Sequence, residues 1–296
     1  MSAMRNAVTV TGMVLALATL APTGPALAFD GEPRPTVSIL PQPAGVPQEP
    51  SRQEALRNWL GQSKAGDASG ALTSLQYAAE KGEPGAAWKL GKMYETGDGV
   101  TEDDRMAFQY YSQVIRQHES DRLDSRAAPY VASAYVALGN FFKTGIDGVV
   151  PRNTQFAEKL FRSAAFNFGD PQAQYELGLI YQQDRRLEAV RVFNLAALKG
   201  HVAAQARLGE TLFDMAQSDD RRARGLMWLT VAQWQSRGVQ DDWIGALHET
   251  YFARASEDIR RQALVMAEGW MQHNRPDLSD TLTVQAAQSI PAAPAQ

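Results

Sequence analysis

Histidine binds metals and transfers protons near neutral pH more readily than any other side chain. The chain has four: His118, His201, His248 and His273. No two of them have the spacing of a metal-ligand pair such as HxxxH, so we expect surface or helix-end residues. The chain contains no cysteine. Thiolate zinc sites, thiol nucleophiles and disulfide bonds are therefore excluded.

Two acidic clusters, in residues 98–104 and 241–242, could in principle bind a cation. Neither follows the ligand order of a calcium-binding EF-hand loop. Each stands where a helix is predicted to begin, and acidic side chains stabilise helix N-termini. The sequence also has no GxSxG, Walker or GxGxxG motif. We therefore predict no metal, no cofactor and no enzymatic activity.

Overall charge argues against nucleic acid as a partner. The chain has 29 Lys and Arg against 33 Asp and Glu, giving a formal net charge of −4. No block of basic residues could follow a phosphate backbone. Its 296 residues, 44% of them hydrophobic, are enough to build a substantial core.

The N-terminus has the features of a removed secretory signal over residues 1–28. Arg5 precedes an apolar run from Ala7 to Leu20, and the small-x-small site Ala26-Leu27-Ala28 follows. That run is shorter than the roughly 20 residues needed to span a bilayer. We predict cleavage after Ala28 and a mature chain that does not itself span a membrane.

Composition divides the remaining chain into three parts. Residues 29–50 contain six prolines and predict an extended linker. Residues 275–296 are rich in Ala, Pro and Gln and predict a disordered tail. The folded domain is expected over residues 51–274.

A repeat within this domain is marked by the dipeptide Leu-Gly, whose glycines are Gly91, Gly139, Gly178 and Gly209. An alanine lies five residues before each of these glycines, and a large apolar residue lies three after it. Small residues let helices approach closely. We therefore predict a first helix around each Leu-Gly, and expect Gly178→Leu to overpack a helix contact.

A second helix of each unit is predicted where a small residue precedes large apolar ones at +3 and +4. Three second helices end in an alanine pair followed by Gly82, Gly169 or Gly200, and glycine is favoured at helix C-termini. Two further helical stretches, residues 241–254 and 256–273, are predicted to cap the array. The fold class is thus an all-α solenoid of antiparallel helix pairs with a C-terminal helical cap.

The columns Ala-x-x-x-Leu-Gly-x-x-Tyr, Gly-x-Gly-Val and Ala-x-x-x-Tyr closely resemble Sel1-like repeats, relatives of tetratricopeptide repeats, over about residues 51–238. A narrower resemblance is to the ExoR family of exopolysaccharide production negative regulators. It rests on the segment Tyr77–Gly82, the turn Tyr94–Val100, the long insertion before the second unit and the N-terminal signal.

The ExoR resemblance implies a periplasmic protein that binds the periplasmic domain of a membrane sensor histidine kinase. It would thereby repress a two-component system, and a periplasmic protease would release the kinase by removing the regulator. One alternative is a secreted Sel1-like adaptor for envelope or secretion assemblies. A less favoured one is an enzyme that binds or hydrolyses β-lactams, because such Sel1-like chains are rich in cysteine and this chain has none.

First helices of such units usually line the concave side of the superhelix, where a partner segment can bind. If the Leu-Gly stripe of each first helix faces the core, the intervening positions of that helix should face the partner. The predicted partner-binding residues are Lys89, Lys92, Glu95, Asn140, Lys143, Glu176, Gln182, Arg207 and Glu210. Their mixed charges suit a selective and reversible contact.

Overall fold

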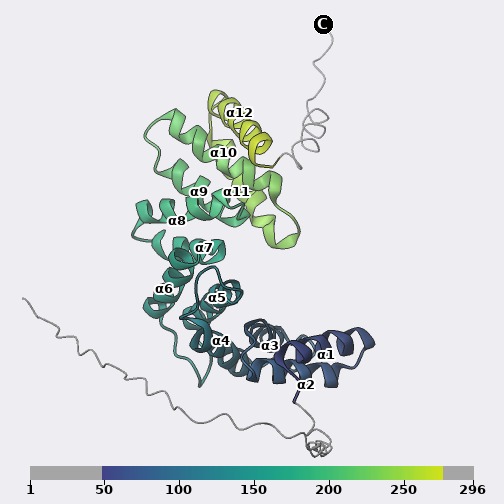
Figure 1. The fold of residues 1–296 in the computed structure, drawn as a ribbon. Helices are drawn as coiled ribbons and strands as arrows, with labels where there is room; N and C mark the ends of the chain where they lie inside the picture. The colour runs from purple at the N-terminus through teal and green to yellow at the C-terminus, as the bar shows by residue number, and fades with distance from the viewer. Residues whose placement is uncertain (1–48, 276–296) are drawn as a thin grey trace, which may run out of the picture. The chain divides into compact units, whose positions relative to one another are not determined.

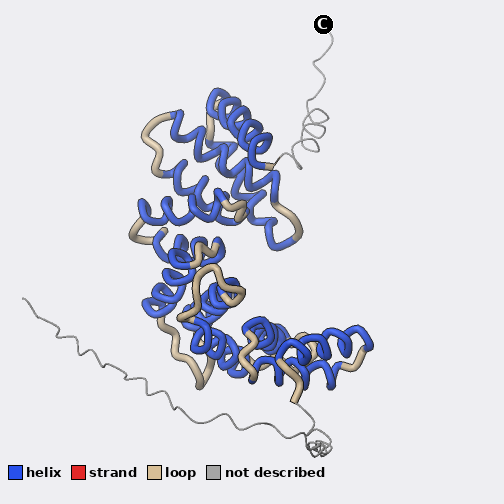
Figure 2. Tube along the Cα trace, viewed as in Figure 1, coloured by secondary structure: helices blue, strands red, loops and turns tan. Residues whose placement is uncertain are grey.

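The computed structural model describes residues 49–275, and the predicted signal, nearly all of the linker and all but the first residue of the tail lie outside this range. Every regular element within it is a helix (Figure 2). The α-helices are α1 (Arg52–Ala65), α2 (Ala68–Glu80), α3 (Pro84–Thr96), α4 (Asp104–His118), α5 (Ala128–Thr144), α6 (Thr154–Arg162), α7 (Pro171–Tyr181), α8 (Arg186–Leu198), α9 (Val202–Asp214), α10 (Asp219–Gln235), α11 (Asp242–Arg254) and α12 (Glu257–Asn274). A π-helix, η1 (Ser163–Asn167), extends α6, and a 3₁₀ turn, η2 (Val239–Asp241), precedes α11.

The helices pack in consecutive pairs, as short connections between helices require. Helix α1 packs on α2, α3 on α4, α5 on α6, α7 on α8, and α9 on α10. Each second helix also packs on the first helix of the next pair, so the array is continuous along the chain (Figure 1). The predicted all-α array of helix pairs is therefore confirmed.

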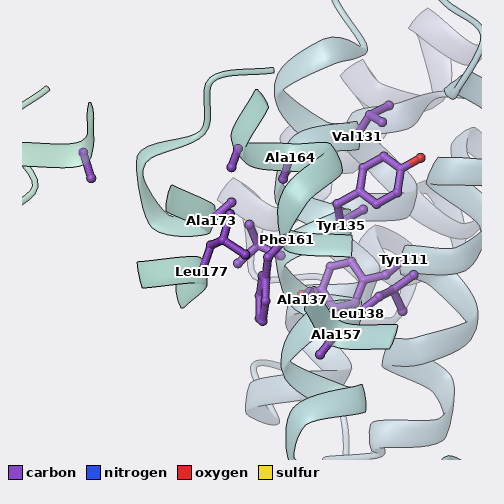
Figure 3. Packing of buried hydrophobic residues seen from close by; sticks show 14 of the residues in the cluster. Tyr111, Val131, Tyr135, Ala137, Leu138, Ala157, Phe161, Ala164, Ala173 and Leu177 are labelled. Carbon is purple, nitrogen blue, oxygen red and sulfur yellow. The ribbon is translucent and has the colours of Figure 1, made fainter. Parts of the chain in front are cut away.

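One apolar cluster runs from α1 to α9 and includes residues of α10 and α12, and a second cluster lies among α9, α10, α11 and α12. The largest fully buried side chains of the first cluster are Tyr111, Phe161 and Phe193. Figure 3 shows Tyr111 and Phe161 in this core, with Leu138 of α5 and Leu177 of α7 nearby. The alanines five residues before each Leu-Gly glycine are all fully buried.

Each of the first three Leu-Gly glycines lies against an aromatic ring of its partner helix. A Cβ built on Gly91 would come within 2.7 Å of the Tyr111 ring, and one on Gly139 within 2.6 Å of the Phe161 ring. On Gly178 it would overlap three atoms of the Phe193 ring. Real Cβ atoms do not approach other atoms this closely, so any side chain here would displace the aromatic ring.

The pair of α9 and α10 is packed differently, because glycine occurs on both helices. A Cβ on Gly209 would lie 2.6 Å from the carbonyl oxygen of Gly225, and one on Gly225 would lie 2.6 Å from the Phe213 amide nitrogen. The backbones of α9 and α10 are therefore in direct contact.

The predicted glycine turns are also found. Gly82, Gly169 and Gly200 end second helices with φ of 82°, 68° and 84°, in the left-handed region that glycine enters without steric cost. Each precedes the next Leu-Gly glycine by nine residues.

The π-helix η1 has a simple origin in the sequence. Between the alanine pair and the terminal glycine, α2 and α8 have two residues, whereas the α6 segment has three: Phe166, Asn167 and Phe168. A π-turn accommodates one extra residue within a helix. Phe168 packs on Tyr135 with ring centroids 6.1 Å apart, while Phe166 stays exposed.

The end of the array folds back on itself. Helix α12 packs along α10, with the rings of Trp228 and Trp270 5.3 Å apart and Met271 buried. None of the helices between residues 49 and 275 is both long enough and apolar enough to cross a membrane.

Candidate protein-interaction surface

The nine predicted partner-binding residues lie on α3, α5, α7 and α9, with Gln182 directly after α7, and are here called the polar row. Glu176 is buried and the other eight are half-buried. Contacts join each first helix to the next. They are Trp88 to Ser133, Lys143 to Glu176, Gln182 to Glu210, and Arg207 to Trp243.

At α3 the row consists of pairs within one repeat. The Lys89 ammonium lies 2.9 Å from an Asp98 carboxylate oxygen, and Lys92 lies 2.9 Å from Glu95. Glu95 also accepts a 2.7 Å hydrogen bond from the hydroxyl of Tyr111. Burial, and then this carboxylate, raise the pKa of Tyr111 far above its ordinary value. The Lys89 and Lys92 charges are thus neutralised locally but remain accessible.

Lys143 and Glu176 make the least exposed ion pair of the row. Lys143 Nζ of α5 donates to Glu176 Oε2 of α7 at 2.6 Å, and the Glu176 side chain is only 9% exposed. The other carboxylate oxygen of Glu176 accepts a 3.1 Å hydrogen bond from the Gln172 amide. Both oxygens are therefore satisfied, as a buried carboxylate requires.

His201, the N-cap residue of α9, links that helix to Gln172 of α7. Its Nδ1 accepts a hydrogen bond from the Ala204 amide at 3.1 Å, which caps α9. Its Nε2 lies 2.9 Å from Gln172 Oε1, and its ring stacks on Tyr175. We assign the neutral ring with its proton on Nε2, because only this form satisfies both contacts. Burial lowers the pKa of His201.

The free energy of unfolding is expected to decrease as the pH is lowered, because His201 becomes protonated. Because its pKa is lowered in the folded chain, the unfolded chain binds the proton more readily, so the His201 contribution is complete above pH 6.5 and decreases below it. His201→Asn keeps a capping acceptor that does not titrate. Urea unfolding between about pH 7.5 and 5 should show a smaller loss for this variant than for wild type, and equal losses would contradict the assignment.

Arg207 and Glu210 of α9 end the row. Arg207 Nη1 donates to Glu210 Oε2 at 2.8 Å, and the guanidinium lies 4.5 Å from the centre of the Trp243 ring. Gln182 reaches Glu210 from the end of α7 at 3.4 Å. Arg207, at the end of the row, therefore contacts α11, which sequence reasoning had treated only as part of a cap.

Two buried glutamines that were not predicted tie a first helix to the segment before it. Gln174 and Gln205, each four residues before a Leu-Gly glycine, donate 3.1 Å hydrogen bonds to the carbonyls of Ala165 and Ala197. These carbonyls belong to the second alanine of the Ala-Ala pairs. The shared spacing from Leu-Gly was the sequence signal that could have identified them.

Other candidate residues have structural roles. Asp103 caps α4 as expected, its carboxylate accepting from the Met106 amide. Asp241 lies at the N-cap of α11 and Asp242 in its first turn, as expected, although the Asp241 carboxylate accepts from the Arg237 amide and makes no capping hydrogen bond to α11. His248 lies within α11, 3.2 Å from the Thr230 hydroxyl, and not at a helix end or in open solvent. No group of residues suited to holding a metal ion occurs in the described range.

A protein-family model described as Sel1 repeat matches residues 84–117, 132–165 and 171–201. These ranges correspond to the pair α3 and α4, the pair α5 and α6 with η1, and the pair α7 and α8. The Sel1 repeat protein of Oxalobacter formigenes has a similar solved structure, with a TM-score of 0.51 and 22% identity, covering 74% of this chain and 86% of that one. This likeness concerns the fold alone.

Two relatives are similar along nearly their whole length, and both are named exopolysaccharide production negative regulator. The protein of Rhizobium meliloti (strain 1021) is 32% identical over 276 residues, covering 91% of this chain and 96% of that protein. The protein of Rhizobium leguminosarum bv. viciae is 33% identical over 262 residues, covering 86% of this chain and 91% of that protein.

Proposed function

Because the chain belongs to the family of exopolysaccharide production negative regulators built from Sel1 repeats, we propose that it represses exopolysaccharide production by holding a protein partner. The partner we propose is the periplasmic domain of a membrane sensor histidine kinase, and the compartment is the periplasm. Removal of the regulator by a periplasmic protease would then release the kinase. The similarity over nearly the whole length of both relatives carries the proposal.

The polar row supports a protein as the bound molecule. It presents lysines, carboxylates and amides along four successive first helices, and these side chains are held in place by contacts within and between repeats. An ordered surface of mixed charge loses little conformational entropy when a partner binds. It also favours selective encounter over permanent association. The signal-like residues 1–28 support the proposed compartment.

Charge reversal at one end of the row tests the surface. Lys89→Glu with Lys92→Glu places new carboxylates beside Asp98 and Glu95, where the lysines now form ion pairs. We expect affinity for the purified sensor domain to fall at least about tenfold, which corresponds to about 1.4 kcal/mol. Because both lysines are substantially exposed, we expect the fold to survive. Affinity is measured by titration calorimetry, and helicity by circular dichroism.

The matched control is Lys64→Glu with Lys159→Glu, which changes net charge equally at exposed lysines of α1 and α6. It should bind and repress like wild type. Equal weakening by both double variants would indicate a general charge effect and reject the polar row. If wild type binds no sensor domain, while deletion of its gene still raises exopolysaccharide, the kinase partner is wrong. Crosslinking in cells would then identify the protein held.

A further inference from the structure

The outer face of α8 carries an exposed apolar stripe, here called the leucine stripe. Leu187, Leu195 and Leu198 are 65%, 40% and 58% exposed. Leu187 and Leu198 are separated by about three whole turns, and Leu195 lies about 80° from Leu187 around the helix axis, so the three side chains share one face. Helix α8 is buried on its other side, where Phe193 and the Ala-Ala pair pack in the core. Contiguous exposed apolar surface of this kind marks a site where something binds.

The neighbouring second helix shows how such a face is covered in this chain. Helix α12 returns along α10, where Trp270 and Met271 pack in the cluster that also contains Trp228. It ends at Asn274, and the next side chain, Arg275, lies directly over Gly200 at the C-terminal end of α8. The chain therefore leaves the described range beside Leu198, at one end of the leucine stripe.

The sequence that continues from this point has matching chemistry. Residues 276–296 contain two leucines four residues apart, Leu278 and Leu282, then Val284. Their only charged side chains are acidic, Asp277 and Asp280. The exposed cations of α8 and its end are Arg186, Arg191 and Lys199.

We propose that residues 276–296 cover the leucine stripe of α8 and run back along that helix from Gly200 toward Arg186. The length suffices, because α8 is about 20 Å long at 1.5 Å per residue and these 21 residues would span about 31 Å even if helical. Helix α8 would then be covered by residues 276–296 as α10 is covered by α12. The contact also withholds the stripe from other proteins.

Crosslinking in the full chain tests the proposal, and the absence of native cysteine makes it clean. Thr283→Cys is combined with Glu188→Cys on α8, and a bismaleimide of about 10 Å reach is added. The matched control combines Thr283→Cys with Val265→Cys on the exposed side of α12. Counted along the helices, Glu188 lies 12 residues from Gly200, whereas Val265 lies only 10 residues from Arg275. Chain length alone would therefore favour crosslinking of the control pair.

We expect the pair with Glu188→Cys to crosslink several-fold faster within one chain than the control pair. Adding Leu187→Ser, Leu195→Ser and Leu198→Ser should abolish the difference, and because these leucines are exposed, circular dichroism should stay unchanged. Equal rates for the two pairs would overturn the proposal. Crosslinks mainly between chains, increasing with protein concentration, would also overturn it, because a second copy would then cover the stripe.

Discussion

Replacing Gly178 with alanine is expected to lower the free energy of unfolding by about 1–3 kcal/mol, the usual cost of overpacking a core. The new methyl group would overlap the ring of Phe193, which is fully buried. Leucine at the same position should cost more, because its side chain needs far more room beside that ring. Urea unfolding followed by circular dichroism measures the change.

Gly269→Ala is the matched control, since Gly269 also lies within a helix but no atom lies within 4 Å of a Cβ built there. It should raise stability by roughly 0.5–1 kcal/mol, because glycine is costly inside a helix. Phe193→Leu should couple with Gly178→Ala, so that the double variant loses less than the sum of the single losses. An unchanged urea midpoint for Gly178→Ala would show that the packing at this column is wrong.

The second large effect is expected from Lys143→Met, with a loss of about 1–3 kcal/mol in the free energy of unfolding. The variant leaves the Glu176 carboxylate, whose side chain is 9% exposed, without its cation. An unpaired buried charge costs more than the pair contributed. Because Lys143 itself is 35% exposed, we expect the lower part of the range known for buried pairs.

Lys89→Met is the control for this prediction, because it removes an identical side chain whose partner Asp98 is 68% exposed. It should cost less than about 1 kcal/mol. Adding Glu176→Gln to Lys143→Met should restore part of the loss, since the amide is neutral and the Gln172 contact can remain. Equal losses for the two lysine variants would show that water reaches Glu176 in the folded chain.

The repeat was predictable because its columns depend on local sterics. A glycine under an aromatic ring, as at Gly178, leaves no room for variation, and a left-handed helix end, as at Gly200, has few alternatives. Such constraints recur at constant spacing and can be read from one chain. The helix pairs and the glycine turns follow from them.

The partners within the polar row were not predictable in the same way. Lys143 and Glu176 are 33 residues apart, and their pairing depends on the orientation of α5 relative to α7. Sequence spacing gives the face of one helix and not the contacts between two helices. The return of α12 along α10 is likewise a long-range contact, because it depends on the packing of Trp270 against Trp228.

The π-turn at η1 has a consequence for how this array tolerates insertions during evolution. One surplus residue near Phe166 is absorbed where a second helix ends, and the nine-residue interval from Gly169 to Gly178 is preserved. Downstream repeats therefore keep their register despite the added residue. Single-residue insertions at the ends of second helices should be accepted by this architecture, whereas insertions between Gly169 and Gly178 would shift every later unit.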